Sequence, residues 1–167
     1  MNLIIYYSRS GENYSNGRIV SLKKGNSKIC AEYIKEAVGG DLFEVETVDD
    51  YSKDYHTCTL EAKKELEEGI HPKLKKYLDN VSRYDNIFIC GPCWWGTYPM
   101  AIFSLLEKLN LKDKNILPLM SHEGSGLGNS IRDLRKYSNH IKTGLAVCGS
   151  DVDKAKDIVY KWAKENI

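Results

Sequence analysis

Residues 3–11 read Leu3-Ile4-Ile5-Tyr6-Tyr7-Ser8-Arg9-Ser10-Gly11, and this stretch decides the fold. Five apolar residues without alternation are typical of a strand that is buried on both faces, as strands of parallel sheets are. The change to serine, arginine and glycine directly after this run predicts a loop at the carboxyl end of the strand. Ligands of open parallel sheets bind beyond the carboxyl ends of the strands, so this loop is a candidate binding segment.

Three further apolar runs repeat the pattern, at residues 86–90, 115–120 and 145–148, the last starting at 145 or near Ile141. Residues 41–48 alternate imperfectly, as an edge strand would. Helical patterns lie between the runs. Apolar faces predict helices over residues 30–38 (stopped by Gly39-Gly40), 103–109, 128–137 and 152–163 (capped by Ser150 or Asp151). Helices are also predicted for the charged segment 59–68 and for the charged segment after Pro72. Strands that alternate with helices predict an α/β fold, with a parallel sheet covered on both faces.

The composition excludes several classes of protein. Of 167 residues, 42% are hydrophobic and 28% charged, and 24 basic against 23 acidic residues give a formal net charge of +1. This balance lacks the basic surface of nucleic-acid binders. The first apolar run has no basic segment before it and is too short for a signal core or a membrane span. We therefore expect one domain over residues 1–167, a cytoplasmic location, and neither nucleic acid nor membrane as a partner.

Two segments that follow the first strand combine hydroxyl groups, glycine and the start of a helix. They are Ser8-Arg9-Ser10-Gly11-Glu12-Asn13 and Gly25-Asn26-Ser27. Free backbone N–H groups and hydroxyls at a helix N-terminus bind phosphate. The chain has no Gly-x-Gly-x-x-Gly and no Gly-Lys-Ser/Thr, which argues against a dinucleotide fingerprint and a nucleotide-hydrolysing loop. Between the two segments, residues 14–24 contain the turn signal Asn16-Gly17 and predict a small flap.

The loop after residues 86–90 is aromatic and reads Gly91-Pro92-Cys93-Trp94-Trp95-Gly96-Thr97-Tyr98-Pro99. Two tryptophans and a tyrosine are costly to expose in such a loop, and a flat aromatic ligand would give them a surface to stack on. We expect one of the two tryptophans to cap the core and the other to meet the ligand.

The loop after residues 115–120 is rich in glycine and reads Ser121-His122-Glu123-Gly124-Ser125-Gly126-Leu127-Gly128. Glycine lets a backbone group approach a ligand closely. His122 and Glu123 are neighbours in the sequence and need not face each other. We therefore interpret them as polar groups at the rim of a pocket rather than as an acid/base pair. No Cys/His pattern has the spacing of a metal site.

The cysteines allow one competing interpretation, because Cys90-Gly91-Pro92-Cys93 spells a dithiol redox motif. Such a motif needs its first cysteine at a helix N-terminus, where the thiolate is stabilised. Cys90 instead ends a predicted strand, so the dithiol role is the less favoured alternative. The odd number of five cysteines does not suggest a disulfide framework, and we expect Cys30, Cys58 and Cys148 to be small buried apolar residues.

Taken together and in this order, these segments resemble the flavodoxin family over nearly the whole chain. The resemblance implies a five-stranded parallel sheet of strand order 2-1-3-4-5 and FMN as the cofactor, with no catalytic side chain. By position, the phosphate contacts would be Ser8, Ser10, Gly11, Asn26 and Ser27, with Arg9 and Asn13 beside them. The isoalloxazine ring would be bordered on one side by Pro92, Cys93, Trp94, Trp95, Gly96, Thr97 and Tyr98, with Trp95 the first choice for stacking and Tyr98 the second. The other side would be lined by Ser121, His122, Glu123, Gly124, Ser125 and Gly126.

The resemblance implies an electron carrier that serves a partner reductase and a partner acceptor. The alternative is an NAD(P)H-dependent reductase of quinones or related acceptors on the same fold, which the near-neutral charge and the flap favour slightly. A third hypothesis is a non-redox module that binds a partner through its aromatic loop. The chain departs from acidic flavodoxins, since 92–98 contain no carboxylate. Acidic surroundings disfavour adding negative charge to a flavin, so we predict a less negative potential for the last reduction step than an acidic flavodoxin has.

Overall fold

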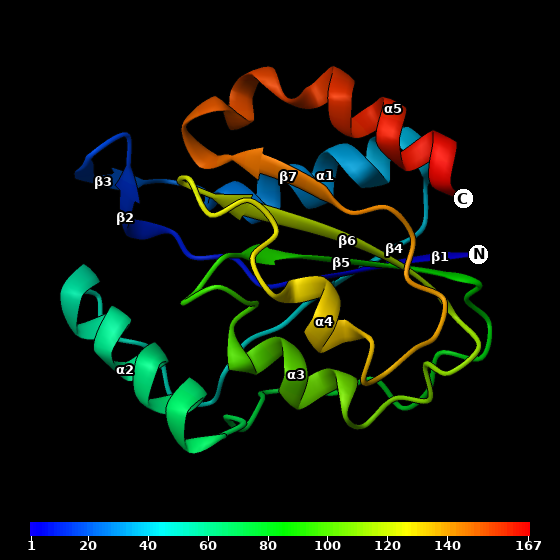
Figure 1. The fold of residues 1–167 in the computed structure, drawn as a ribbon, viewed down its shortest axis with the longest axis horizontal. Coiled ribbons are helices and arrows are strands. Elements are labelled where there is room, and N and C mark those ends of the chain that lie inside the picture. Colours follow the sequence, from blue (N-terminus) through cyan, green and yellow to red (C-terminus); the bar gives the residue numbers. More distant parts are fainter.

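The computed structural model describes all residues 1–167, and a five-stranded parallel sheet lies at its centre (Figure 1). The strand order is β4-β1-β5-β6-β7, made by β1 (Asn2–Tyr6), β4 (Asp41–Glu44), β5 (Asn86–Pro92), β6 (Asn115–His122) and β7 (Leu145–Cys148). Counted by themselves, these strands have the order 2-1-3-4-5, so the predicted sheet is confirmed. The expected edge strand is also confirmed, although it ends at Glu44 rather than at residue 48.

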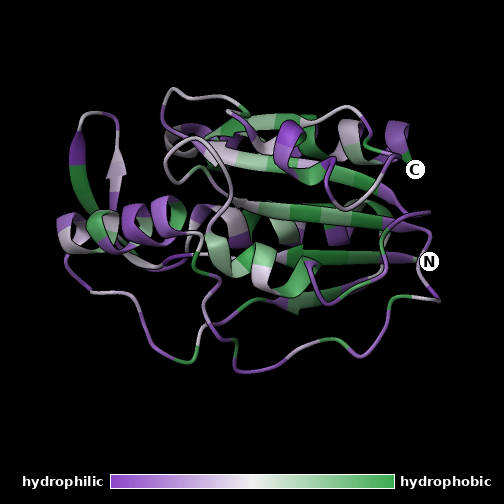
Figure 2. Ribbon diagram, turned by 60° about the horizontal axis from the view of Figure 1, so that its bottom comes forward, coloured by the Kyte–Doolittle hydropathy of each residue, from purple (hydrophilic) through white to green (hydrophobic).

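Helices cover both faces of the sheet. On one face lie α1 (Asn26–Val38) and α5 (Lys156–Asn166), and on the other lie α3 (Met100–Leu106) and α4 (Ser130–Leu134) (Figure 1). Successive side chains of a strand point to opposite faces, so β1 supplies Leu3 and Ile5 to the core under α3 and supplies Ile4 to the core under α1 and α5. Burial on both faces explains why the strands carry unbroken apolar runs, which stand out in Figure 2.

Three helix predictions need correction. The helix expected over 128–137 is limited to α4, and the helix expected over 152–163 is divided at Ala155 into a 3₁₀ turn, η1 (Gly149–Lys154), and α5. Ser150 and Asp151 therefore lie inside η1 rather than at a cap. No helix follows Pro72, because this segment pairs with the chain beyond β4: the N–H of Val48 donates to the carbonyl oxygen of Lys73, and the N–H of Lys75 donates to that of Glu46.

Two elements stand beyond the carboxyl end of the sheet (Figure 1). One is the hairpin of β2 (Gly11–Ser15) and β3 (Arg18–Leu22), which confirms the predicted flap. Its turn residues Asn16 and Gly17 have φ values of 50° and 85°, the left-handed conformation that a tight hairpin turn requires. The other is α2 (Tyr55–Glu68), which is capped by the carboxylate of Asp54. None of the helices has the length and apolar character that crossing a bilayer requires.

Candidate functional site

A cleft lies at the carboxyl edge of the sheet and consists of two adjoining cavities of about 280 and 340 Å³. The walls of both cavities include Asn13, Tyr55, Cys93, Trp94 and Ser125. The smaller cavity reaches Asn26 at the start of α1 and Gly149 at the start of η1, and the larger one reaches α2. The cleft therefore joins the loops after β1, β5 and β6, as the sequence predicted.

The start of α1 and the neighbouring loop after β1 are rich in unpaired backbone donors. The N–H groups of Asn26 and Ser27 begin the helix and donate to no acceptor in the protein, and the same holds for the N–H groups of Ser8, Arg9 and Ser10. The hydroxyl of Ser8 accepts a hydrogen bond from the N–H of Lys28 at 3.1 Å. The first turn of α1 contains no acidic residue. Unpaired N–H groups at the positive end of a helix dipole suit an anion.

Not every residue that was predicted to contact the phosphate lines the cleft. Ser8, Ser10 and Gly11 line a separate cavity of about 530 Å³ that opens toward β4, and Arg9 lines both this cavity and the cleft. Ser27 is buried, with its hydroxyl oxygen 2.9 Å from that of Ser121. Asn13 and Asn26 do line the cleft. The structure thus brings the asparagines together in the cleft, while the role predicted for the three serines and Gly11 stays a prediction.

The two tryptophans occupy different positions, but the structure does not divide the core and the cleft between them. Trp94 packs against the core and meets Tyr7 and Tyr51 edge to face, with ring centroids 5.1 and 5.0 Å away, yet it lines both cavities of the cleft. Trp95 is 50% exposed and lines only the larger cavity. Its indole N–H donates to the carbonyl oxygen of Thr59 in α2 at 2.8 Å. The indole of Trp94 is thus an aromatic wall for the cleft, and Trp95 fastens the β5 loop to α2, while stacking of Trp95 on a ligand stays a prediction.

The prediction that Tyr98 stacks on a ligand is wrong. Its side chain is 0% exposed, and its hydroxyl donates to the carbonyl oxygens of Ile89 at 3.1 Å and Leu119 at 2.9 Å. Thr97 is also buried and donates to the carboxylate of Asp133 at 2.7 Å. The loop turns inward after Gly96, so both side chains hold the structure together and do not contact the cleft. Pro92, Cys93 and Gly96 do line it.

The β6 loop places its first polar residues in the cleft and its glycines outside. The cleft is lined by Ser121, His122, Glu123 and Ser125, whereas Gly124 and Gly126 line neither cavity. The ring nitrogen Nδ1 of His122 accepts a hydrogen bond from the N–H of Gly124 at 2.9 Å. Glu123 turns instead toward the hairpin, where its Oε2 accepts from the N–H of Asn16 at 3.3 Å. His122 and Glu123 thus have different hydrogen-bond partners.

The cysteines do not form a dithiol site. Cys90 is fully buried in β5, and its Sγ donates to the carbonyl oxygen of Ser27 at 3.2 Å. Burial, together with the neighbouring Cys30 thiol, raises the pKa of Cys90 well above its usual value. Cys93 and Cys58 line the cleft, and burial raises the pKa of the Cys58 thiol to about 11. The buried positions expected for Cys30 and Cys58 are confirmed, while Cys148 is only half-buried.

Sequence reasoning missed the contribution of α2. Tyr55, Cys58, Thr59 and Ala62 line the larger cavity, although the segment reads as a charged, solvated crossover. The signal was present in the spacing, since Tyr55, Cys58 and Ala62 recur at helical intervals among lysines and glutamates. The hairpin closes the same side, because Tyr14 stacks on Tyr55 with ring centroids 6.4 Å apart.

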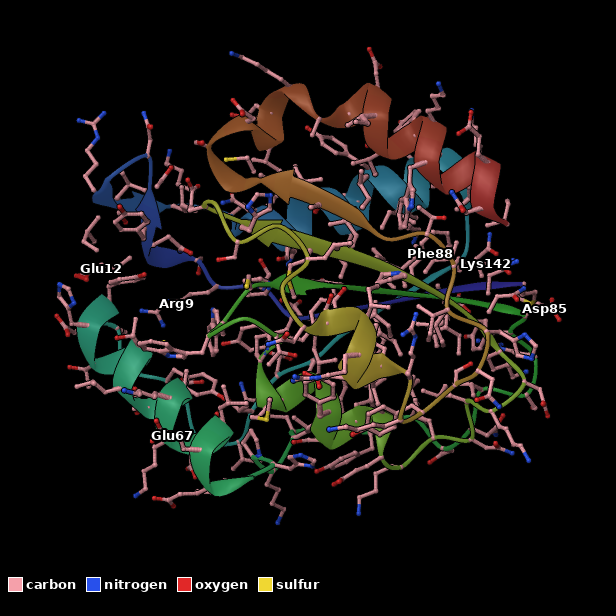
Figure 3. All side chains as sticks on the ribbon, viewed as in Figure 1. Arg9, Glu12, Glu67, Asp85, Phe88 and Lys142 are labelled. Atoms are coloured by element: carbon pink, nitrogen blue, oxygen red, sulfur yellow. The ribbon has the colours of Figure 1, made fainter.

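The charges of the cleft are few. Of all residues that line the two cavities, Arg9 is the only lysine or arginine and Glu123 the only carboxylate. Arg9, which is labelled between the hairpin and α2 in Figure 3, is held by backbone oxygens rather than by an ion pair. Its Nε donates to the carbonyl oxygen of Glu12 at 2.9 Å and its Nη2 to that of Lys53 at 3.1 Å. The cleft therefore combines a donor-rich end, an aromatic wall and little net charge.

Comparisons with known proteins agree with this architecture. The model of the flavodoxin family matches residues 20–166. A protein from Bacteroides eggerthii assigned as a flavoprotein is 26% identical, with a TM-score of 0.70 and coverage of 95% of this chain and 96% of that one. Another such protein, from Bacteroides uniformis, is 22% identical (TM-score 0.74, coverage 98% and 97%). A flavoprotein from Lactobacillus acidophilus, crystallised in complex with FMN, is 25% identical (TM-score 0.63, coverage 92% and 96%). No curated protein matches the chain.

Proposed function

The chain belongs to the flavodoxin family, and from this premise we propose that its cleft binds one molecule of FMN and uses it to carry electrons between redox partners. The observation that carries the proposal is the combination of two kinds of group at one cleft. Unpaired N–H groups lie at the start of α1, and the indole of Trp94 lines both cavities. A phosphate tail and a planar ring need these two environments side by side.

The residues of the cleft fit FMN in charge as well as in shape. The donors near the start of α1 are neutral, and the only cation of the cleft, Arg9, lies at the α2 end. The similar protein from Lactobacillus acidophilus was crystallised with FMN, which supports the same cofactor here. When bound, FMN supplies one- and two-electron redox chemistry, and the protein supplies binding, orientation and electrostatic tuning. We also propose that residues 1–167 form one flavodoxin-like domain, because β1 and β7, from both ends of the chain, lie in the same sheet.

One observation favours a second candidate, an NAD(P)H-dependent reductase of quinones or related acceptors. The larger cavity is enclosed by α2 and contains Arg9, a cation without a carboxylate partner. Such an enclosed cavity is better suited to a small electron acceptor beside a flavin than to contact with the large acidic surface of a partner protein. A carrier needs a partner reductase and a partner acceptor, whereas a reductase takes hydride from NAD(P)H directly.

Two measurements test these proposals. Purified protein, reconstituted with FMN and freed of excess, should show the yellow absorption of a bound flavin, and inorganic phosphate should weaken the binding of FMN but not that of lumiflavin, which has no phosphate. A colourless protein that fails to bind added FMN would favour the non-redox module. Rapid bleaching of the bound flavin by NADPH alone would decide for the reductase, and inertness toward NADPH for the carrier.

A further inference from the structure

One part of the larger cavity lies beside α2 and is not shared with the smaller cavity. This part, the α2 compartment, is lined by the residues that border the larger cavity alone, which are Arg9, Cys58, Thr59, Ala62, Trp95 and Gly96. In the proposed function, the phosphate of FMN lies near the start of α1 and the ring lies along Trp94, which borders both cavities. The α2 compartment is then available for a second molecule beside the ring.

The α2 compartment has one formal charge, the guanidinium of the half-buried Arg9. The carbonyl oxygens of Glu12 and Lys53 accept from its Nε and Nη2, at 2.9 and 3.1 Å. These oxygens orient the guanidinium but do not neutralise it, and Nη1 has no oxygen acceptor in the protein. Because arginine side chains that are withdrawn from water usually pair with an anion, the free nitrogen of Arg9 indicates an anionic partner from outside the chain.

No carboxylate lies in the compartment to compensate this charge. Glu61 and Glu65 of α2 accept hydrogen bonds from residues 51–52, at 2.7 and 2.5 Å, and neither carboxylate lines the cleft. Cys58 is a neutral thiol at neutral pH, because burial and, to a lesser extent, the two carboxylates raise its pKa to about 11 against the lowering effect of the Arg9 charge. The guanidinium thus acts on the α2 wall of the cavity, where the protein supplies no negative charge.

The indole of Trp95 gives the compartment a flat apolar surface that a ligand can reach. Trp95 is 50% exposed and has a φ of 55°, a left-handed conformation that a bulky residue rarely adopts. Its indole N–H donates to the carbonyl oxygen of Thr59 at 2.8 Å, which fixes the orientation of the ring. The flat ring and the guanidinium of Arg9 together favour a planar ligand that carries a negative charge.

We propose that the α2 compartment binds a planar electron acceptor with an anionic group, such as a sulfonated or carboxylated quinone. This inference rests on the second candidate function, a reductase of small acceptors. The anionic group pairs with the guanidinium of Arg9, and the rings of the acceptor lie between the indole of Trp95 and the flavin. Arg9 then determines the specificity among acceptors, because an uncharged acceptor would displace water from the guanidinium without giving it a partner.

Two ligands that accept no electrons test the preference for an anion without turnover. Naphthalene-2-sulfonate and naphthalene-2-sulfonamide have the same rings and nearly the same shape, and only the sulfonate is charged at neutral pH. Their dissociation constants are measured by isothermal titration calorimetry with the FMN-loaded and the flavin-free protein. Arg9→Met removes the charge, and Arg9→Lys keeps it without the planar guanidinium. Arg18→Met is the matched control, since Arg18 is exposed in the hairpin and lines neither cavity.

The FMN-loaded protein should bind the sulfonate about tenfold or more tightly than the sulfonamide, as is typical of a hydrogen bond between charged groups. The ratio of the two constants should fall to within about twofold in Arg9→Met, return in part in Arg9→Lys, and stay unchanged in Arg18→Met. Because each ratio is taken within one protein, a general loss of folded protein cancels. With NADPH as the electron donor, Arg9→Met should raise the KM of a sulfonated naphthoquinone about tenfold or more and change the KM of NADPH by less than about twofold.

Equal affinity for the two ligands, or a preference that Arg9→Met retains, would overturn the inference. A preference that the flavin-free protein shows and the FMN-loaded protein lacks would also overturn it, because the compartment would then belong to the flavin. A rise in KM that is confined to NADPH would assign the charge to the dinucleotide and not to the acceptor. Failure of the protein to bind FMN, or of NADPH to bleach the bound flavin, would instead overturn the proposed reductase and the acceptor role with it, whatever the two naphthalene ligands show.

Discussion

Replacing Gly25 by alanine tests whether the loop between β1 and α1 holds the phosphate. Gly25 precedes α1 with φ −65° and ψ 148°, which alanine adopts freely, so the effect of the substitution is steric. The added Cβ would lie 2.1 Å from Ser8 Oγ and 2.6 Å from the carbonyl oxygen of Arg9, where 3.4 Å is an ordinary contact. The serine can rotate away, but the carbonyl belongs to the backbone. The loop must therefore shift by several tenths of an ångström.

The shift displaces the unpaired N–H groups of Ser8, Arg9 and Ser10 and the Ser8 hydroxyl that accepts from Lys28. A hydrogen bond to a charged group contributes about 1.5–3 kcal/mol. Loss of one such bond to the phosphate weakens FMN by about 10- to 150-fold. Overpacking at this position lowers the free energy of unfolding by about 1–3 kcal/mol, a loss that urea denaturation of the flavin-free protein measures separately.

The assay compares FMN with riboflavin by fluorescence titration in the unsubstituted protein and in Gly25→Ala. We expect the large loss for FMN and a change of less than about twofold for riboflavin, which has no phosphate for the loop to hold. An equal loss for both ligands would mean that the loop serves the ring or the sugar chain. Unchanged FMN affinity would mean that the phosphate lies elsewhere, and either result refutes the assignment of this loop.

Four further predictions follow from the same geometry. Trp94→Phe should weaken FMN, riboflavin and lumiflavin alike by about 2- to 10-fold in fluorescence titrations, because the wall of the ring site is reduced. Tyr98→Phe should lower the free energy of unfolding in urea by about 1–2 kcal/mol and leave FMN affinity unchanged, since its hydroxyl serves two buried carbonyls. The Cys58 thiol, whose pKa is raised to about 11, should react fully with iodoacetamide only as the pH approaches 11, and mass spectrometry would locate the adduct. Because the pKa of this thiol in the folded protein lies above the ordinary value of 9, its contribution to the free energy of unfolding falls as the pH rises from 9 through 11. Spectroelectrochemical titration should give a less negative potential for the last reduction step than in an acidic flavodoxin, because the cleft contains a single carboxylate and a single arginine; a very low value would contradict this.

The sheet could be predicted from the sequence because the residues of a strand themselves indicate that strand. Four of the five strands are short unbroken apolar runs, and burial on both faces is the environment that suits such a run in an α/β protein. The failed helix after Pro72 shows the limit of local patterns. Lys73 and Lys75 gain backbone hydrogen bonds to Val48 and Glu46, and no periodicity within residues 72–85 reveals partners that lie some 25 residues earlier.

The site could be predicted as a set of loops but not as a set of side chains. Strand topology alone brings the loops after β1, β5 and β6 to one edge of the sheet. The direction of each side chain depends on backbone conformation that composition does not determine. The β5 loop reverses at Trp95, whose φ is 55°, and Gly96, whose φ is 85°, and this reversal sends Tyr98 into the core. A residue type suited to stacking was therefore assigned to the cleft from a position that faces away from it.

Helix α2 and the β2–β3 hairpin lie beside the cleft and would control the access of an electron acceptor to a bound ring. Few contacts attach them to the rest of the protein. Of the side chains of α2, only Cys58 and Ala62 are buried. Two of its polar attachments are through its backbone: Trp95 donates to the carbonyl oxygen of Thr59, and Glu12 accepts from the N–H of Tyr55. Two more are through its side chains, because Glu61 accepts from the N–H of Ser52 and Glu65 from the hydroxyl of Tyr51. An element with so little buried apolar surface opens at a low cost in free energy, and its opening leaves the two cores of the sheet intact. A closed α2 and hairpin shield the ring end of the cleft for a small acceptor, and an open pair would expose the same ring to a protein partner. The flavodoxin-like sheet does not distinguish a reductase from a carrier, so the two proposals differ in whether α2 and the hairpin stay closed or open over the cleft.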